Sequence, residues 1–223
     1  MLVGNNLPLL GPWLIRGLLL CIVFLAVAGS GCQQAPNVLL FGSTNNVRTA
    51  DKQAAVQWAE PMQVQDLPNL YKVSDALYRG AQPTAEGLQE LQKLGIKTVI
   101  NLRESNGDQA RLAELGVAYE HIPMSAFHLK DDDVVRFLRI AGDQGHAPIF
   151  VHCQRGADRT GLMCAVYRIG VQGWTKDQAI AEMTQGGFRF NHGLQNIVNY
   201  IRRLDIDQIK QRAGLTPELV GNH

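Results

Sequence analysis

The sequence predicts an α/β fold: a central, mostly parallel sheet of four to five strands with helices on both faces. Short apolar runs rich in β-branched residues alternate along the chain with longer segments of helical periodicity. Glycines and prolines separate these segments, and strands that alternate with helices in this way pair in parallel. The clearest unit is the apolar run 148–151, which is followed by a loop over residues 152–161 and a helical segment from residue 162.

Each expected element is justified by its apolar pattern and by the residues at its ends. Strands are expected at residues 77–79, 96–102, 117–123 and 148–151. Helices are expected at residues 84–94, 108–115, 131–141, 162–169, 175–185 and 195–212. Thr84 and Thr175 are well placed to cap the helices at 84–94 and 175–185, and Gly95 and Gly116 end the helices at 84–94 and 108–115.

Composition and charge narrow the class of protein. The 223 residues are 46% hydrophobic and 18% charged, which is enough for one domain of about 150 residues and a leader. The formal net charge of +1 provides no basic field, so we expect no nucleic-acid partner. The 4 cysteines form no CxxC pattern, and the sequence contains no metal-ligand cluster, so we expect neither a metal nor a cofactor.

The start of the chain differs in composition from the rest. Residues 1–31 contain no acidic residue, and Arg16 precedes an apolar run over 17–28 that ends in small residues. This pattern is typical of a signal peptide, and an uncleaved membrane anchor is the alternative. The remaining organisation is a polar tether, a globular domain and a flexible tail, at residues 32–60, 61–212 and 213–223.

Cys32 directly follows the small residues of this leader. A cysteine in this place resembles the bacterial lipobox, in which the cysteine is lipidated and becomes the mature N-terminus. Gly29 departs from that pattern, which prefers leucine three residues before the cysteine. The resemblance implies an exported lipoprotein, tethered to a membrane on the periplasmic or extracellular side of a bacterial cell.

The loop over residues 152–161 carries a nucleophile and a cation that suit a phosphate ester. A cysteine at a helix N-terminus beside an arginine has a lowered pKa, so Cys153 is expected to be a thiolate near neutral pH. A thiolate is the nucleophile that attacks phosphorus. The guanidinium group of Arg159 can bind two phosphate oxygens at once. Thr160 can donate its hydroxyl to the sulfur, which makes the thiolate a better leaving group.

The rest of this loop is suited to surround an anion. Its backbone N–H groups and the positive end of the following helix favour negative charge. Glycines permit the close approach and the unusual dihedral angles that such a cradle requires. The residues expected to bind the substrate are His152, Gln154, Arg155, Gly156, Ala157 and Gly161.

The string HCQRGADRTG resembles the Cys-x5-Arg signature, HCxxGxxR[ST], of the protein tyrosine and dual-specificity phosphatase superfamily. Its ending, DRTG, resembles the atypical bacterial branch, and residues 73–83 resemble the start of the domain in the same enzymes. The resemblance implies a hydrolase that forms a phosphocysteine on Cys153 and acts on phosphotyrosine or phosphoserine proteins. A phospholipid such as a phosphoinositide, or another small phosphate ester, is the alternative substrate. Ala157 stands where a lysine would favour a polyanionic headgroup, but Arg155 keeps that substrate open.

The identity of the general acid is left open by the sequence. The resemblance implies an aspartate after the strand 117–123, yet residues 124–130 contain no carboxylate. Asp158 is one candidate, because repulsion from a bound dianion favours its protonated form. Asp131, Asp132 and Asp133 are the others, although acidic residues in a first helical turn usually complement the helix dipole. His121 and His128 are weaker candidates. Arg103 and Glu104 follow the strand 96–102 and could line the pocket, with an exposed ion pair as the default expectation.

Two other functions are compatible with parts of this pattern. A non-catalytic phosphate-binding pseudophosphatase is disfavoured, because the nucleophile, the arginine and Thr160 are all intact. A rhodanese-like sulfurtransferase also uses a cysteine loop, but the Arg-Thr-Gly ending and the following helix disfavour it.

Overall fold

The computed structural model describes residues 56–215. The predicted signal peptide, Cys32 and most of the predicted tether lie outside the described residues, as does residue 216 onwards of the predicted tail. The fold begins slightly before residue 61, because Ala59 is buried and the first strand starts at Glu60.

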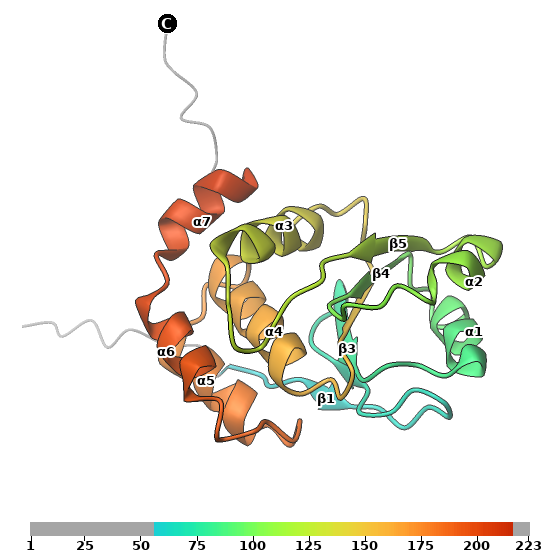
Figure 1. The fold of residues 1–223 in the computed structure, drawn as a ribbon, viewed down its shortest axis with the longest axis horizontal. Helices are drawn as coiled ribbons and strands as arrows, with labels where there is room; N and C mark the ends of the chain where they lie inside the picture. Colours follow the sequence, from blue (N-terminus) through green and yellow to red (C-terminus); the bar gives the residue numbers. More distant parts are fainter. Residues whose placement is uncertain (1–55, 216–223) are drawn as a thin grey trace, which may run out of the picture. The chain divides into compact units, whose positions relative to one another are not determined.

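In the described part of the chain, six strands form one sheet in the order β1-β2-β3-β6-β4-β5 (Figure 1). The strands are β1 (Glu60–Pro61), β2 (Tyr71–Lys72), β3 (Leu77–Gly80), β4 (Thr98–Asn101), β5 (Ala118–His121) and β6 (Ile149–His152). The pairs β3–β6, β6–β4 and β4–β5 are parallel, which confirms the predicted mostly parallel sheet. Strands β1 and β2 pair antiparallel at one edge and were not predicted, because two residues are too few to show an alternation.

The described residues also form seven helices: α1 (Ala85–Lys93), α2 (Gln109–Glu114), α3 (Asp131–Ala141), α4 (Asp158–Gly170), α5 (Lys176–Gln185), α6 (Gln195–Arg203) and α7 (Ile206–Ala213). The predicted caps are present, because the Thr84 and Thr175 side chains accept hydrogen bonds from backbone N–H groups in the first turn of α1 and α5. The prediction of a single last helix over 195–212 is wrong. Asp205 caps α7 by accepting from the Gln208 N–H at 3.0 Å, which starts a second helix there.

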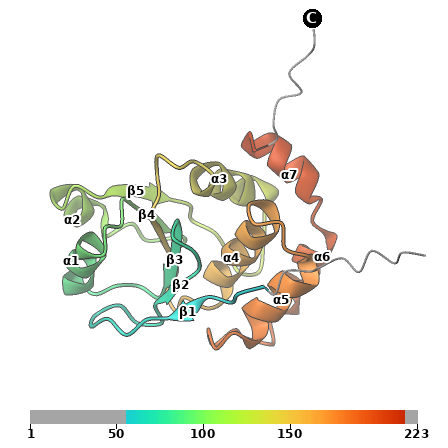
Figure 2. The same ribbon diagram turned by 180° about the vertical axis from the view of Figure 1, so that it is seen from behind.

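Helices cover both faces of the sheet, as predicted (Figures 1 and 2). Successive side chains of β6 point to opposite faces of the sheet, so this strand contributes to two hydrophobic cores. Phe150 packs with residues of α1 and α2 in one cluster, whereas Ile149 and Val151 pack with residues of α3 to α7 in the other. All four residues of β6 are therefore buried, and the strand lies at the centre of the sheet.

The register of the parallel strands brings three loops to one edge of the sheet. His152 at the end of β6 is paired with Gly80 at the end of β3 and with Asn101 at the end of β4. The segments that follow these strands therefore begin side by side. In open α/β sheets, ligands bind at this carboxyl edge, and the cysteine loop starts here with Cys153.

A buried ion pair joins α4 and α5 at the opposite end of α4. The side chains of Arg168 and Glu182 are each only 3% exposed, and Arg168 Nε donates to Glu182 Oε2 at 2.8 Å. Glu182 also accepts the backbone N–H of Ala59, and Arg168 donates to the carbonyl of Val73. The pair thus connects the start of the described chain to the helical layer.

Replacing Glu182 by leucine is expected to lower the free energy of unfolding by about 3–5 kcal/mol, because the substitution leaves the Arg168 charge buried without its partner. Urea denaturation followed by circular dichroism measures the change. Glu90→Gln is the matched control, since its pair with Lys93 is exposed and such pairs contribute at most about 1 kcal/mol. Equal effects of the two substitutions would contradict a structural role for the buried pair.

Candidate active site

The loop between β6 and α4 borders a cavity of about 340 Å³. Five residues at or near this loop line the cavity: Cys153, Gln154, Arg155, Asp158 and Arg159. The other predicted residues of the loop are buried and do not line it: His152, Gly156, Ala157, Thr160 and Gly161. Their position beneath the cavity lets them contribute to the shape of the loop.

The carbonyl groups of residues 154–157 all accept hydrogen bonds from the body of the domain. The Gln82 backbone N–H donates to the first carbonyl at 3.3 Å, and the side-chain amide of Asn69 donates to the second at 3.0 Å. Arg79 donates from Nη2 to the last two, at 2.8 and 3.4 Å. In a planar trans peptide the N–H points opposite to the C=O. The N–H groups of residues 155–158 therefore face away from these donors, an arrangement that can surround an anion.

Gly156 shows why the loop needs glycine at this position. Its φ is +68°, a left-handed conformation that residues with a side chain rarely adopt. A Cβ atom there would lie 2.4 Å from the carbonyl carbon and oxygen of Gly80, at the end of β3. The close approach to β3 is what lets Arg79 reach the Gly156 carbonyl.

Arg79 is buried to 1% exposure beneath the loop, where its guanidinium carbon lies 3.7 Å from the centroid of the Phe188 ring. The structure places it against the carbonyls of Gly156 and Ala157. It both fixes the loop and leaves a positive charge below the cradle.

The environment of Cys153 favours a thiolate. Burial raises the pKa of the Cys153 thiol, but the Thr160 hydroxyl and backbone N–H, the Arg159 guanidinium and the Arg155 backbone N–H outweigh burial and lower that pKa below its ordinary value. Thr160 Oγ1 is buried and has no geometric hydrogen-bond partner among the described residues. The Cys153 thiol is the neighbouring group whose pKa this hydroxyl lowers.

Arg159 is held at the cavity by the two neighbouring strands. Its Nη1 donates to the carbonyls of Leu102, after β4, and Met124, after β5, at 3.1 and 3.3 Å. These bonds use one terminal nitrogen, and the guanidinium fork is pre-positioned before any substrate binds. The preceding His152 adds no charge, because burial lowers its pKa to about 4.

Asp158 forms a bridge between the cysteine loop and the segment before α6. Its Oδ2 accepts from Arg155 Nη2 at 3.0 Å, and its Oδ1 accepts from the backbone N–H of Asn191 at 2.8 Å. Both oxygens are therefore engaged. The Arg155 side chain is nevertheless 66% exposed at the mouth of the cavity, where it can meet a substrate.

The other candidate acids lie away from the cavity. The Asp131 carboxylate accepts from the Tyr200 hydroxyl at 2.7 Å, and Asp132 pairs with Arg212 of α7. Burial raises the pKa of Asp133, but this residue does not line the cavity either. The first turn of α3 thus faces α6 and α7.

Glu104, which the sequence left open as a pocket residue, does line the cavity. Sequence reasoning missed four others that line it: Ser125, Phe127, Asn191 and Leu194. Phe127 is 73% exposed, which is unusual for a large apolar side chain and places it at the rim. The position of Glu104 directly after the predicted strand 96–102 was the available signal, since loops at the carboxyl edge carry functional groups.

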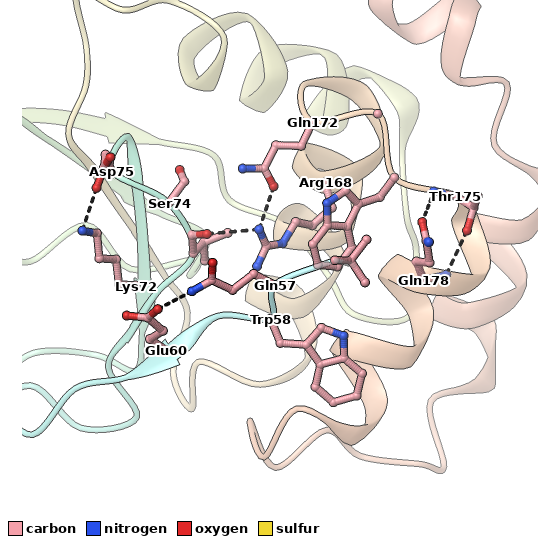
Figure 3. A pocket seen from close by; sticks show the side chains of 14 residues that line it. Gln57, Trp58, Glu60, Lys72, Ser74, Asp75, Arg168, Gln172, Thr175 and Gln178 are labelled. Atoms are coloured by element: carbon pink, nitrogen blue, oxygen red, sulfur yellow. Dashed lines mark hydrogen bonds and ion pairs between the residues drawn. The ribbon is translucent and has the colours of Figure 1, made fainter. Parts of the chain in front are cut away.

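A larger cavity, of about 610 Å³, lies at the other end of α4 (Figure 3). Trp58 and Trp174 line it, and Arg168 stacks on the Trp174 ring at 4.1 Å. Several polar side chains that line this cavity bond one another, as in the Lys72–Asp75 pair and the bond from Arg168 to Gln172. Its lining contains no cysteine among the described residues, whereas the smaller cavity holds Cys153.

Replacing Thr160 by valine is expected to raise the pKa of Cys153, because it removes the hydroxyl that lowers that pKa while keeping the shape of a buried side chain. The rate of iodoacetamide alkylation at the Cys153 peptide, followed by mass spectrometry against pH, should rise at higher pH than in the wild type. The Cys164 peptide is the internal control, since burial raises the pKa of that thiol to about 11. Coincident pH profiles for the two proteins would exclude a bond from Thr160 to the sulfur.

Comparison with known proteins adds independent support. A family model described as "DSP-PTPase phosphatase fused to NAD+ Kinase" matches residues 51–197. The chain is 35% identical over 173 residues to the dual specificity protein phosphatase TpbA of Pseudomonas aeruginosa (strain UCBPP-PA14), which covers 77% of this chain and 78% of TpbA. It is 27% identical over 156 residues to the inositol diphosphatase DSP3 of Arabidopsis thaliana, covering 64% of this chain and 73% of DSP3.

Solved structures agree in fold. The crystal structure of a P. aeruginosa TpbA variant in complex with pTyr matches with a TM-score of 0.64 and 33% identity, over 73% of this chain and 99% of that one. The Siw14 catalytic core matches with a TM-score of 0.60 over 69% of this chain and 95% of that one, at 23% identity, a likeness of fold alone. The chain therefore belongs to the DSP-PTPase family, and it is a phosphatase of the protein tyrosine and dual-specificity type.

Proposed function

We propose that this phosphatase hydrolyses phosphomonoesters through a phosphocysteine intermediate on Cys153, and that its substrates are phosphotyrosine and phosphoserine proteins. One observation carries the mechanism: Cys153, with its lowered pKa, follows β6 directly and begins a loop whose carbonyls are all bonded to the domain. A thiolate nucleophile and an array of N–H donors that face the phosphate are the two requirements of this reaction.

The reaction proceeds in two displacements at phosphorus. In the first, the Cys153 thiolate forms the S–P bond while the P–O bond to the substrate alcohol breaks, and the departing oxygen takes up a proton. The loop N–H groups and Arg159 stabilise the negative charge on the equatorial oxygens. In the second, water forms a new P–O bond, gives up a proton and releases inorganic phosphate, and the thiolate returns, stabilised by the Thr160 hydroxyl.

The rim of the cavity favours an aromatic phosphate ester. Phe127, Ala126, Met124 and Leu194 supply apolar lining beside the cysteine loop. A phenyl ring stacked on an exposed phenylalanine gains about 0.5–1.5 kcal/mol beyond the burial of its surface. The relative TpbA has been crystallised in complex with pTyr, which supports the same substrate class for this chain.

A phosphoinositide or another small phosphate ester is the second candidate substrate. The exposed guanidinium of Arg155 favours it, because a second anionic group at the rim would find a cation there. The relative DSP3 is an inositol diphosphatase. Against it, Arg155 is already paired with Asp158, and the cavity lining contains only one other cation, Arg159, among the described residues.

We also propose that the enzyme is exported and tethered to a membrane through Cys32. The support is the leader over residues 1–31 and the small residues before Cys32. Among residues 56–215, no helix is both long and apolar enough to cross a bilayer.

Cys153→Ser is expected to abolish hydrolysis of para-nitrophenyl phosphate and of a phosphotyrosine peptide, because serine supplies no thiolate at neutral pH. Rapid acid quench of the wild type during turnover should reveal a phosphorylated Cys153 peptide by mass spectrometry. Cys164→Ser is the control, since this second buried thiol lies within α4 and does not line the cavity, and it should retain activity. Turnover by Cys153→Ser would disprove the mechanism.

Phe127→Ala is expected to reduce kcat/KM for a phosphotyrosine peptide about 5- to 10-fold, because a stacked aromatic pair is lost. Activity on a phosphoserine peptide should change little. The side chain is exposed, so the fold is expected to be unaffected. Val171→Ala, which shortens an exposed apolar side chain after α4, serves as the matched control. An equal loss on both peptides would count against Phe127 as a determinant of specificity.

A further inference from the structure

The first displacement requires a proton donor, and the described carboxylates can be sorted by position. The loop between β5 and α3, residues 122–130, contains no carboxylate. Asp131 and Asp132 bond side chains of α6 and α7 and do not line the cavity. Among the described residues, Asp158 and Glu104 are the carboxylates in the lining.

Both carboxylate oxygens of Asp158 accept hydrogen bonds. Its two oxygens accept from a guanidinium group and from a backbone N–H, both of which are donors that cannot act as acceptors. Protonating the carboxylate would remove the negative charge that strengthens both of these bonds. Asp158 is therefore better suited to position Arg155 and the Asn191 segment than to give up a proton.

The carboxylate of Glu104, unlike that of Asp158, has no bonding partner among the described residues. Its side chain is exposed, lines the same cavity as Cys153, and makes no hydrogen bond or ion pair with the described residues. The expected ion pair with Arg103 is absent from the described structure, because Arg103 Nη1 donates to Gln82 Oε1 at 2.7 Å. Both oxygens of Glu104 are left to carry a proton.

Hydrogen bonds to the side chains of Asn101 and His121 fix the backbone on either side of Glu104. The fully buried side chain of Asn101 accepts from the Arg103 N–H at 2.8 Å and donates to the Ser105 carbonyl at 2.8 Å. The His121 ring lies 2.7 Å from the Arg103 carbonyl and bonds it. A buried amide thus clamps the two neighbours of an exposed, unpaired glutamate. Rigid support beneath a free side chain is how a reactive group is held in position.

We propose that Glu104 is the general acid of this phosphatase, an inference that rests on the proposed function. Repulsion from the bound phosphate dianion favours the protonated carboxyl group. Glu104 gives its proton to the departing oxygen as the P–O bond breaks. The resulting carboxylate then takes the proton from the attacking water as the S–P bond breaks, and the cycle leaves Glu104 protonated again.

Leaving-group dependence tests the assignment. Glu104→Gln is expected to lower kcat/KM for phenyl phosphate about 10²- to 10³-fold, because phenolate leaves slowly without a proton. For 2,4-dinitrophenyl phosphate, whose leaving group needs no proton, the loss should be under about 5-fold. Glu104→Asp should recover part of the activity on phenyl phosphate.

Two further variants separate the alternatives. Asp158→Asn is expected to lower kcat/KM for both substrates by a similar factor, because it disturbs the position of Arg155 and not proton transfer. Glu114→Gln, an exposed glutamate on α2 that does not line the cavity, should match the wild type. A selective loss of activity on phenyl phosphate in Asp158→Asn overturns the assignment of Glu104. The assignment is also overturned if Glu104→Gln shows no such selective loss. Absence of turnover by the wild type overturns instead the proposed function on which the assignment rests.

Discussion

The site depends on the bonds that hold the carbonyls of residues 154–157 against the domain. A loop of this length has many conformations, and the cradle forms only when its carbonyls face inward to the protein. Gln82, Asn69 and Arg79 supply the donors for this arrangement. Because an unsatisfied buried carbonyl costs about 1–3 kcal/mol, turning over the peptides whose carbonyls Arg79 binds is unfavourable. The N–H donors are therefore in place before the substrate arrives, which is the condition for strong electrostatic catalysis.

Arg79 adds a second contribution that is specific to its burial. Its guanidinium group bonds no carboxylate among the described residues, and its charge is balanced by two loop carbonyls and by the face of the Phe188 ring. A cation in such surroundings is only weakly screened, so its field extends to the cavity above. Two arginines thus attract the phosphate from different directions. Arg159 can bind the oxygens directly, whereas Arg79 acts through the loop.

The features that the sequence predicts correctly are contiguous along the chain. The features that it does not predict depend on which strands lie side by side in the sheet. The order of apolar strand, cysteine loop and helix is contiguous, so residues 148–169 predict both the central strand and the nucleophile. The roles of Arg79, Asn101 and Glu104 depend on which strand ends lie beside β6, which the sequence does not state. Adjacent opposite charges at Arg103 and Glu104 favoured an ion pair, but Gln82, brought close by the fold, is the bonding partner of Arg103.

The contacts divide the chemistry between two strand ends. The loop after β6 provides the nucleophile and the binding of charge, and its own carboxylate, Asp158, is used to hold that loop to Asn191. A carboxylate that is bonded on both oxygens stiffens a loop, and protonating it weakens the ion pair that helps to hold that loop. Proton transfer is then best assigned to a neighbouring segment, and the loop after β4 is the one that presents a supported and unpaired carboxylate, Glu104. The same separation explains how the loop between β5 and α3 can lack an acid and carry apolar residues such as Phe127 instead.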